Sequence, residues 1–353
     1  MTAAGDVSTT PLSILLCYRG APANPGSQRL ASIVLEELGQ RVHVVEDGPI
    51  DLSPFDVILL YGNPGYFPRM RRQLLATERE QRPLVATLHA EPLPPPRASG
   101  LPRWAALTVA EMGKIILNDP RATDIYSNHF KLRRMMREGT IDLLFAMSAE
   151  KQEYASEEGY ESWHIPYGYH PILGRLLEPP SDRDVDVLFL GDSRPWRRTR
   201  LLRRLKRAGV DVTIRGSWYA DGKGLWGDER TRFLNRTKII IHVQRYPGKL
   251  ASMRYFMAMA NGVLVISEPA YKPEPFVNGE HYVAATIDEM PEVIKYYLAH
   301  PDQRERITAA AHRLVTEELS YRRSMEQMLG VIEERVQLRK RTSNSLALNN
   351  AQS

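Results

Sequence analysis

A stretch in the second half of the chain carries residues suited to binding a diphosphate. The apolar run Ile239–Val243 is followed by a loop that contains Gly248, and Ser252 is a favourable first residue for the helix after it. Free backbone N–H groups at a helix start attract anions, and nearby cations add charge-assisted hydrogen bonds. An ordinary capped helix with surface cations would give the same pattern. The residues expected to contact the diphosphate are Arg245, Lys249, Leu250, Ala251, Ser252 and Arg254.

A second turn rich in arginine follows the apolar run Val185–Leu190. Gly191 permits a tight turn, and Arg194 and Arg197 lie where they could reach the same phosphate. The alternative is a solvated helix, and this is the favoured interpretation for Arg200–Arg207, where leucines recur at helical spacing.

In the first half of the chain, two residues could take a proton from a hydroxyl group. His89 ends the strand-like segment that begins at Leu84, and Glu91 opens a proline-rich loop just after it. A histidine titrates near neutral pH and is a common general base, and a carboxylate is the alternative. A lone histidine is more often structural, so both interpretations stay open.

Metal chemistry has little support in the sequence. Cys17 is the only cysteine, it lies in an apolar run, and the histidines lack metal-ligand spacing. Asp184 and Asp186 flank one residue at the start of a strand, away from any phosphate loop. We therefore expect neither a metal nor a cofactor.

These candidate residues need a scaffold, and two series of short apolar runs supply it. Helical patterns separate the runs in each series, which predicts parallel sheets covered on both faces and so two Rossmann-like domains. Ligands bind at the carboxyl ends of such strands, where the candidate residues lie. The expected strands are Ile14–Tyr18, Val42–Val45, Val57–Leu60, Leu84–Leu88 and Leu143–Met147, then Val185–Leu190, Val210–Ile214, Ile239–Val243, Val263–Ser267 and His281–Val283.

The second series resembles the C-terminal half of GT-B glycosyltransferases, and most closely the spore-maturation CgeB-like glycosyltransferases. That family has an Arg-x-x-Glu-x-x-Ala-x-Gly helix followed by a strand and then Phe-x-x-Gly. The resemblance extends over about 185–334, and in the first half it is one of fold pattern only. The matching positions here are Arg254, Met257, Ala260, Gly262, Phe276 and Gly279.

The resemblance implies a GT-B fold, with two Rossmann-like domains that face a central cleft. It also implies metal-independent, hexosyltransferase-like transfer of a sugar from a nucleotide-sugar, which is a substrate rather than a cofactor, to a hydroxyl of a glycan, lipid-linked or surface-polymer acceptor. We expect an acceptor domain at 11–170, a linker at 171–184, a donor domain at 185–336 and a disordered tail at 337–353.

One position departs from the family pattern. Met257 stands where GT-B enzymes commonly place a glutamate on the donor ribose, and a methionine cannot accept that hydroxyl hydrogen bond. Glu268, at the end of the next expected strand, is the candidate replacement, although an exposed loop carboxylate is the alternative. The departure also leaves open a degenerate GT-B protein that binds a ligand or partner without turnover.

Composition and charge restrict the surroundings and partners. The chain has an apolar share of 43%, a net charge of +5 and no apolar run long enough for a membrane span. We expect a cytoplasmic protein, because no signal peptide is evident. Nucleic acid is not expected, since no binding signature accompanies the charge. Basic clusters favour phosphates or a peripheral contact with the inner face of the membrane, and they lie at Arg69–Arg72, Lys131–Arg137 and Arg194–Arg207.

Overall fold

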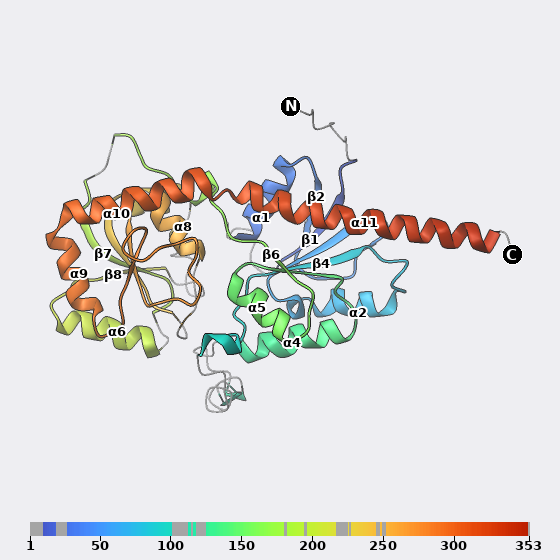
Figure 1. Cartoon of the computed structure of the whole chain (residues 1–353), viewed down its shortest axis with the longest axis horizontal. Helices are drawn as coiled ribbons and strands as arrows, with labels where there is room; N and C mark the ends of the chain where they lie inside the picture. Colours follow the sequence, from blue (N-terminus) through green and yellow to red (C-terminus); the bar gives the residue numbers. More distant parts are fainter. Residues whose placement is uncertain are drawn as a thin grey trace. The chain divides into compact units, whose positions relative to one another are not determined.

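The computed structural model describes the chain in segments that contain two separate α/β sheets (Figure 1). The described residues are 10–18, 27–100, 112–113, 116–117, 125–179, 182–193, 196–216, 225, 227–244, 248 and 252–351. The predicted site residues Arg194, Arg245, Lys249, Leu250 and Ala251 lie outside these segments.

The first sheet has six strands in the order β2-β1-β3-β4-β5-β6. Its central strands β3 and β4 are buried along their whole length, which explains their nearly unbroken apolar sequences. The register pairs β1 with β2 and β3, and β3 with β4, all in parallel. The strands are β1 Ser13–Cys17, β2 Arg41–Val45, β3 Val57–Tyr61, β4 Leu84–His89, β5 Leu143–Ala146 and β6 Trp163–His164.

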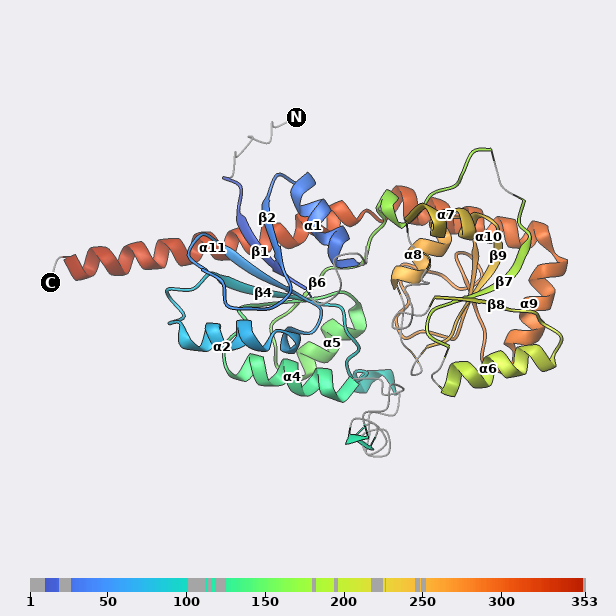
Figure 2. The same ribbon diagram turned by 180° about the vertical axis from the view of Figure 1, so that it is seen from behind.

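Helices cover both faces of this sheet. Helices α2 (Pro68–Ala76) and α4 (Ile125–Arg137) run side by side on one face, opposite α1 (Ser27–Glu37) (Figures 1 and 2). An ion pair between Arg71 and Glu138 connects α2 to the end of α4. Helix α5 spans Ala149–Glu157, and short 3₁₀ turns lie at Pro64–Tyr66, Arg97–Ser99 and Pro171–Leu173.

The second sheet has five strands in the order β11-β10-β9-β7-β8, and all its pairings are parallel. Its core is formed by Val187, Phe189, Ile239 and Ile241 with residues of the surrounding helices, among them Leu201. The strands are β7 Val185–Leu190, β8 Thr213–Arg215, β9 Thr237–His242, β10 Leu264–Ser267 and β11 Val283–Ala284. The helices are α6 Trp196–Arg207, α7 Gly227–Asn235, α8 Ser252–Ala260, α9 Met290–Ala299 and α10 Pro301–Arg313, with a π turn at Leu314–Glu318.

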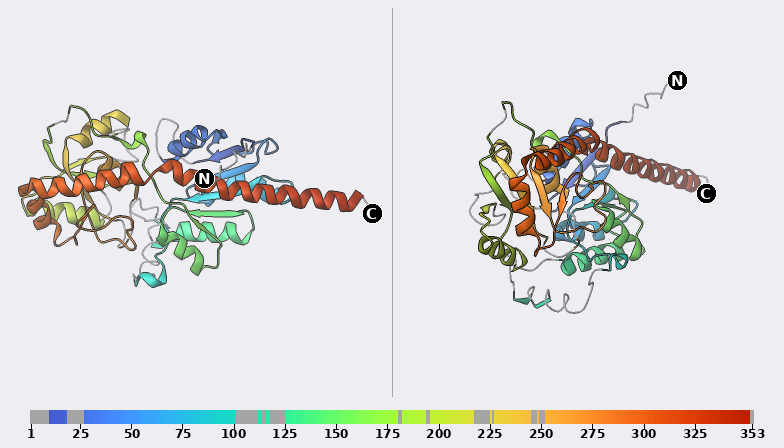
Figure 3. Two further views of the ribbon diagram at one scale, coloured as in Figure 1. Left: turned by 45° about the horizontal axis from the view of Figure 1, so that its top comes forward. Right: turned by 60° about the vertical axis from the view of Figure 1, so that its left-hand side comes forward.

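The last helix, α11, corrects one expectation. It spans Tyr321–Ala351, so the segment 337–353, expected to be a disordered tail, is helical as far as Ala351 (Figure 3). Arg339 forms an ion pair with Asp142 at 2.7 Å, and Lys340 forms one with Asp56 at 3.0 Å. These contacts with the first sheet's strand ends stabilise a helix whose local composition is polar.

By spatial contacts the chain divides into two units that interleave along the sequence. The first contains 1–91, 130–145 and 325–353, and the second contains 92–129 and 146–324. Both sheets lie where two Rossmann-like series were expected, one before residue 171 and one after residue 184. The finer domain boundaries stay predictions.

Candidate functional site

The ends of strands β7 and β9 and the first turn of helix α8 meet at the guanidinium of Arg254. Strands β7 and β9 are parallel and adjacent, so Gly191 and His242 lie at the same carboxyl edge, beside the first turn of α8. Arg254 Nη1 lies 3.1 Å from His242 Nδ1. Since arginine only donates, Nδ1 accepts, and the imidazole proton then sits on Nε2. The imidazole thereby orients the guanidinium.

Gly191 is the residue that admits this guanidinium. Its φ is +136°, a region that residues with a side chain rarely adopt. A Cβ atom at this position would lie 2.7 Å from Arg254 Nη2, well inside van der Waals contact. The structure thus brings together two predicted residues, Gly191 and Arg254, and adds His242. The sequence does not single out His242, which lies inside the expected strand Ile239–Val243, and only its position near the strand end points to the site.

Helix α8 starts at Ser252, close to where the sequence predicts a helix start. Its first-turn N–H groups therefore open at the carboxyl edge of the sheet, next to Gly191 and Arg254. A helix start with an arginine beside it is a favourable place for an anion such as phosphate.

Arg197 and Glu268 form a second cluster at this edge. Glu268 follows β10, is 7% exposed, and forms an ion pair with Arg197 of α6. Its other oxygen accepts a hydrogen bond from the backbone N–H of Gln244 at 3.0 Å. Burial raises the pKa of Glu268, and the charge of Arg197 opposes that rise. Glu268 is thus a buried, paired carboxylate rather than an exposed loop residue, and its role on a ribose stays a prediction.

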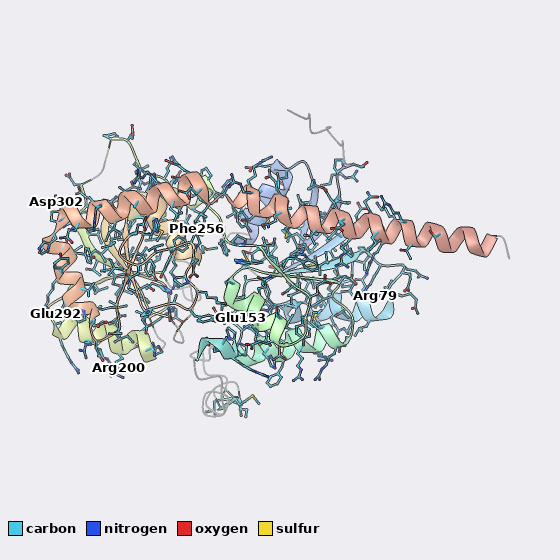
Figure 4. All side chains as sticks on the ribbon, in the orientation of Figure 1. Arg79, Glu153, Arg200, Phe256, Glu292 and Asp302 are labelled. Atoms are coloured by element: carbon cyan, nitrogen blue, oxygen red, sulfur yellow. The ribbon has the colours of Figure 1, made fainter. Side chains whose placement is uncertain are left out.

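The neighbouring Arg198 has a structural task. It is 4% exposed and donates to the backbone carbonyl oxygens of Val243 at 3.0 Å and Asp192 at 2.8 Å. It thereby ties together the segments that follow β7 and β9. On the outer face of the same helix, Arg200 is exposed, in agreement with a solvated α6 surface (Figure 4).

Met257 lies on a buried face of helix α8. It is 5% exposed, and its neighbours Phe256 and Ala258 are buried as well. This environment fits a core methionine. Whether its side chain also borders a donor ribose stays a prediction.

The two candidate bases follow β4 of the first sheet and differ in burial. His89 is 1% exposed, whereas Glu91 is half-buried. The Glu91 carboxylate lies beside Gly62, which follows the adjacent strand β3: a Cβ atom on Gly62 would be 3.6 Å from Glu91 Oε1. Of the two, Glu91 is therefore the one whose side chain is open to a substrate.

Metal-binding and membrane-spanning features have not been found in the described segments. These residues contain no group of three or more His, Cys, Asp and Glu side chains placed to hold a metal ion. Within the same segments, no helix is long and apolar enough to cross a membrane. Cys17 is buried, and burial raises the pKa of its thiol to about 12, which fits a core residue.

A family model matches the second half of the chain. Residues 197–330 match the family described as glycosyl transferase-like. No curated protein matches the sequence. The family match extends from α6 to the first turns of α11 and includes Arg197, Arg254 and Glu268. It does not distinguish the CgeB-like enzymes, so that closer resemblance stays a prediction.

Solved structures extend the likeness to nearly the whole chain. Alr3699/HepE from Anabaena, solved in complex with UDP and glucose, is similar with a TM-score of 0.61 and 13% identity, over 91% of this chain and 99% of that one. Sucrose-phosphate synthase from Thermosynechococcus elongatus has a TM-score of 0.64 and 12% identity, over 92% and 98%. A glycosyltransferase from Rickettsia africae has a TM-score of 0.58 and 13% identity, over 92% and 99%. The chain therefore has the GT-B fold, which confirms the expected fold class.

Proposed function

We propose that this chain is a glycosyltransferase that moves a sugar from a nucleotide-sugar to an acceptor hydroxyl. The observation that carries the proposal is the convergence of Arg254, Gly191 and the start of α8 at one strand edge. This edge lies inside the segment that matches the glycosyl transferase-like family. The Anabaena protein of the same fold was solved with UDP-glucose, so a UDP-hexose is the first donor to test.

The geometry suits a leaving diphosphate. When the bond between sugar and diphosphate breaks, negative charge grows on the departing oxygen. The helix start and the Arg254 guanidinium are fixed in advance by backbone geometry and by His242, so they can stabilise that charge without rearrangement. In this proposal the cations and the helix start do the work that a metal ion performs in other transferases.

On the acceptor side, Glu91 is the proposed base. A base must approach the hydroxyl within hydrogen-bonding distance, and the half-buried Glu91 can do so more readily than the buried His89. Its acceptor is a glycan or a lipid-linked sugar, in line with the expectation from the sequence.

Calorimetry with UDP and UDP-glucose tests the donor assignment. Arg254→Ala should weaken UDP binding by about 10-fold or more, since a charge-assisted hydrogen bond is lost. Arg200→Ala removes an exposed cation from α6 and should bind as wild type does. If wild type binds none of the common nucleotide-sugars, the proposal is wrong.

A second candidate, a GT-B protein that binds its ligand without turnover, is motivated by Met257. Release of UDP from a bound UDP-sugar, with and without acceptor preparations, separates the two. Binding without any turnover would favour the second candidate. Met257→Glu should keep or raise donor affinity if this position borders the ribose, and Glu268→Ala should lower it if Glu268 has taken over that contact.

A further inference from the structure

A surface hollow on helix α4 lies in the first unit, apart from the candidate donor site. It has a volume of about 360 Å³ and is lined by Phe130, Arg133, Arg134, Arg137 and Glu138. Phe130, Arg133, Arg134 and Arg137 recur at the spacing of one helical stripe. The opposite stripe, with Leu132 and Met135, is buried. The hollow therefore faces outward, and Phe130 is 51% exposed in it.

The hollow carries a surplus of positive charge. Glu138 is its one lining carboxylate, and it already binds Arg71 and, at 3.0 Å, Arg134. The hydrogen bond from Arg71 lowers the pKa of Glu138, so this carboxylate is ionised and committed to those two partners. Within the part of the chain that the structure describes, Arg133 and Arg137 form no ion pair or hydrogen bond. Two guanidinium groups are thus available to a ligand.

Helix α2 extends the same surface. It lies beside α4, connected by the Arg71–Glu138 pair, and its own exposed stripe contains Arg69, Arg72 and Leu75 (Figures 1 and 2). Leu75 is 48% exposed. The resulting α2–α4 surface combines the exposed cations Arg69, Arg72 and Arg137 and the half-buried Arg133 with two exposed apolar side chains, Leu75 and Phe130.

We propose that the α2–α4 surface binds an anionic lipid bilayer. The arginines would contact lipid phosphates, while Phe130 and Leu75 would enter the interface between headgroups and acyl chains. This occupant accounts for both kinds of side chain. A nucleic acid would engage the cations and Phe130, but it gives no role to Leu75. A free phosphate would leave both apolar residues in water.

Sedimentation of the full chain with lipid vesicles tests the proposal. At moderate salt, wild type should bind vesicles that contain about one-third phosphatidylglycerol and should not bind pure phosphatidylcholine vesicles. Arg133→Ala with Arg137→Ala should weaken binding by about 30-fold, because each basic residue near an anionic surface contributes about fivefold. Arg133→Lys with Arg137→Lys should retain most of the binding, since the charge is kept.

A matched control removes the same charge from the other unit. Arg203 and Arg207 lie on the exposed face of α6, and Arg203→Ala with Arg207→Ala should bind vesicles as wild type does. Phe130→Ser keeps the charge and should weaken binding by several-fold through loss of apolar insertion alone. Unchanged UDP binding and thermal melting in each variant establish that the fold is intact.

Four results would overturn the proposal. The first is a wild type that ignores the anionic vesicles, and the second is an Arg133/Arg137 alanine variant that binds them unchanged. The third is an equal loss of vesicle binding in the α6 control variant, which would show that binding depends only on the net charge of the chain. The fourth is binding of a different ligand in place of vesicles. Loss of vesicle binding in the presence of inorganic phosphate alone would assign the hollow to free phosphate, and binding of a single-stranded oligonucleotide in place of vesicles would assign it to nucleic acid.

Discussion

Arg254 depends on a neighbour that has no side chain. Replacing Gly191 by alanine places a Cβ atom 2.7 Å from Arg254 Nη2 and imposes a φ of +136° on a residue that resists it. We expect Gly191→Ala to lower UDP affinity by about 10-fold or more, because the guanidinium must move. Calorimetry measures this loss.

Gly209 offers the matched control for that variant. Its φ is also positive, at +77°, but a Cβ atom there would meet nothing within 4 Å. Gly209→Ala should therefore cost about 1 kcal/mol of stability and leave UDP affinity unchanged. Equal affinity losses in both variants would show that backbone strain, not the contact with Arg254, governs donor binding.

Part of the candidate donor edge, whose contact with a donor stays a prediction, was predictable at this scale, because a glycine after a strand and a cation in a first helical turn are visible in the sequence. Gly191 and Arg254 were predicted in this way. His242 was not, since its contact with Arg254 depends on how α8 packs back on β9. The burial that separates His89 from Glu91 was equally hidden, because both follow the same strand.

Between elements, the ion pair of Arg71 and Glu138 connects α2 to α4 and titrates. The pKa of Glu138 is lowered in the folded chain, chiefly by the hydrogen bond from Arg71, so its stabilising effect is present above its ordinary pKa of 4.5 and lost below it. A double-mutant cycle with Arg71→Ala and Glu138→Gln should give a coupling of about 0.5 to 1 kcal/mol at neutral pH. Urea unfolding should show that coupling fading as the pH falls below 4.5. A coupling that grows on acidification would contradict the assignment.

Asp142, just before β5, connects several segments of the first unit through its carboxylate. Its side chain is 5% exposed, accepts a hydrogen bond from Val85 N at 2.8 Å, and pairs with Arg79 and Arg339. Asp142→Asn should destabilise the fold by about 3 kcal/mol, since the buried Arg82, whose Nη2 lies 3.9 Å from Asp142 Oδ1, loses its counter-charge. Asp186→Asn, which removes an exposed partner of Lys238, should cost less than about 1 kcal/mol. Similar unfolding midpoints for the two variants would refute the structural role of Asp142.

The elements themselves were predicted where their burial is complete. Strands β3 and β4 follow the apolar runs closely, but the edge strand β8 begins at Thr213, three residues after the expected Val210, because an exposed edge places little constraint on hydrophobicity. Helix α11 was not predicted from the sequence, and its polar end from residue 337 was expected to be disordered. Its stability there comes from the ion pairs of Arg339 with Asp142 and of Lys340 with Asp56. These partners are distant in sequence, so the local composition does not reveal them.

For the whole molecule, donor binding should raise the free energy of unfolding. A ligand that binds only the folded chain stabilises it by about 2.7 kcal/mol when present at about a hundred times its Kd. UDP should therefore raise the Tm of wild type by about 5 °C, and it should do so much less for Arg254→Ala at the same concentration. Differential scanning fluorimetry measures both. An equal rise in Tm for both proteins would show that UDP does not contact Arg254.

The interleaved division of the chain also sets an order of events during synthesis. The first unit needs residues from 1–91, 130–145 and 325–353, whereas the second is supplied by 92–129 and 146–324. At about 5 to 20 residues per second, the ribosome takes on the order of ten seconds or longer to add the intervening stretch. The N-terminal sheet must wait through that interval without Arg339 and Lys340, and the unit that is begun first is the one completed last.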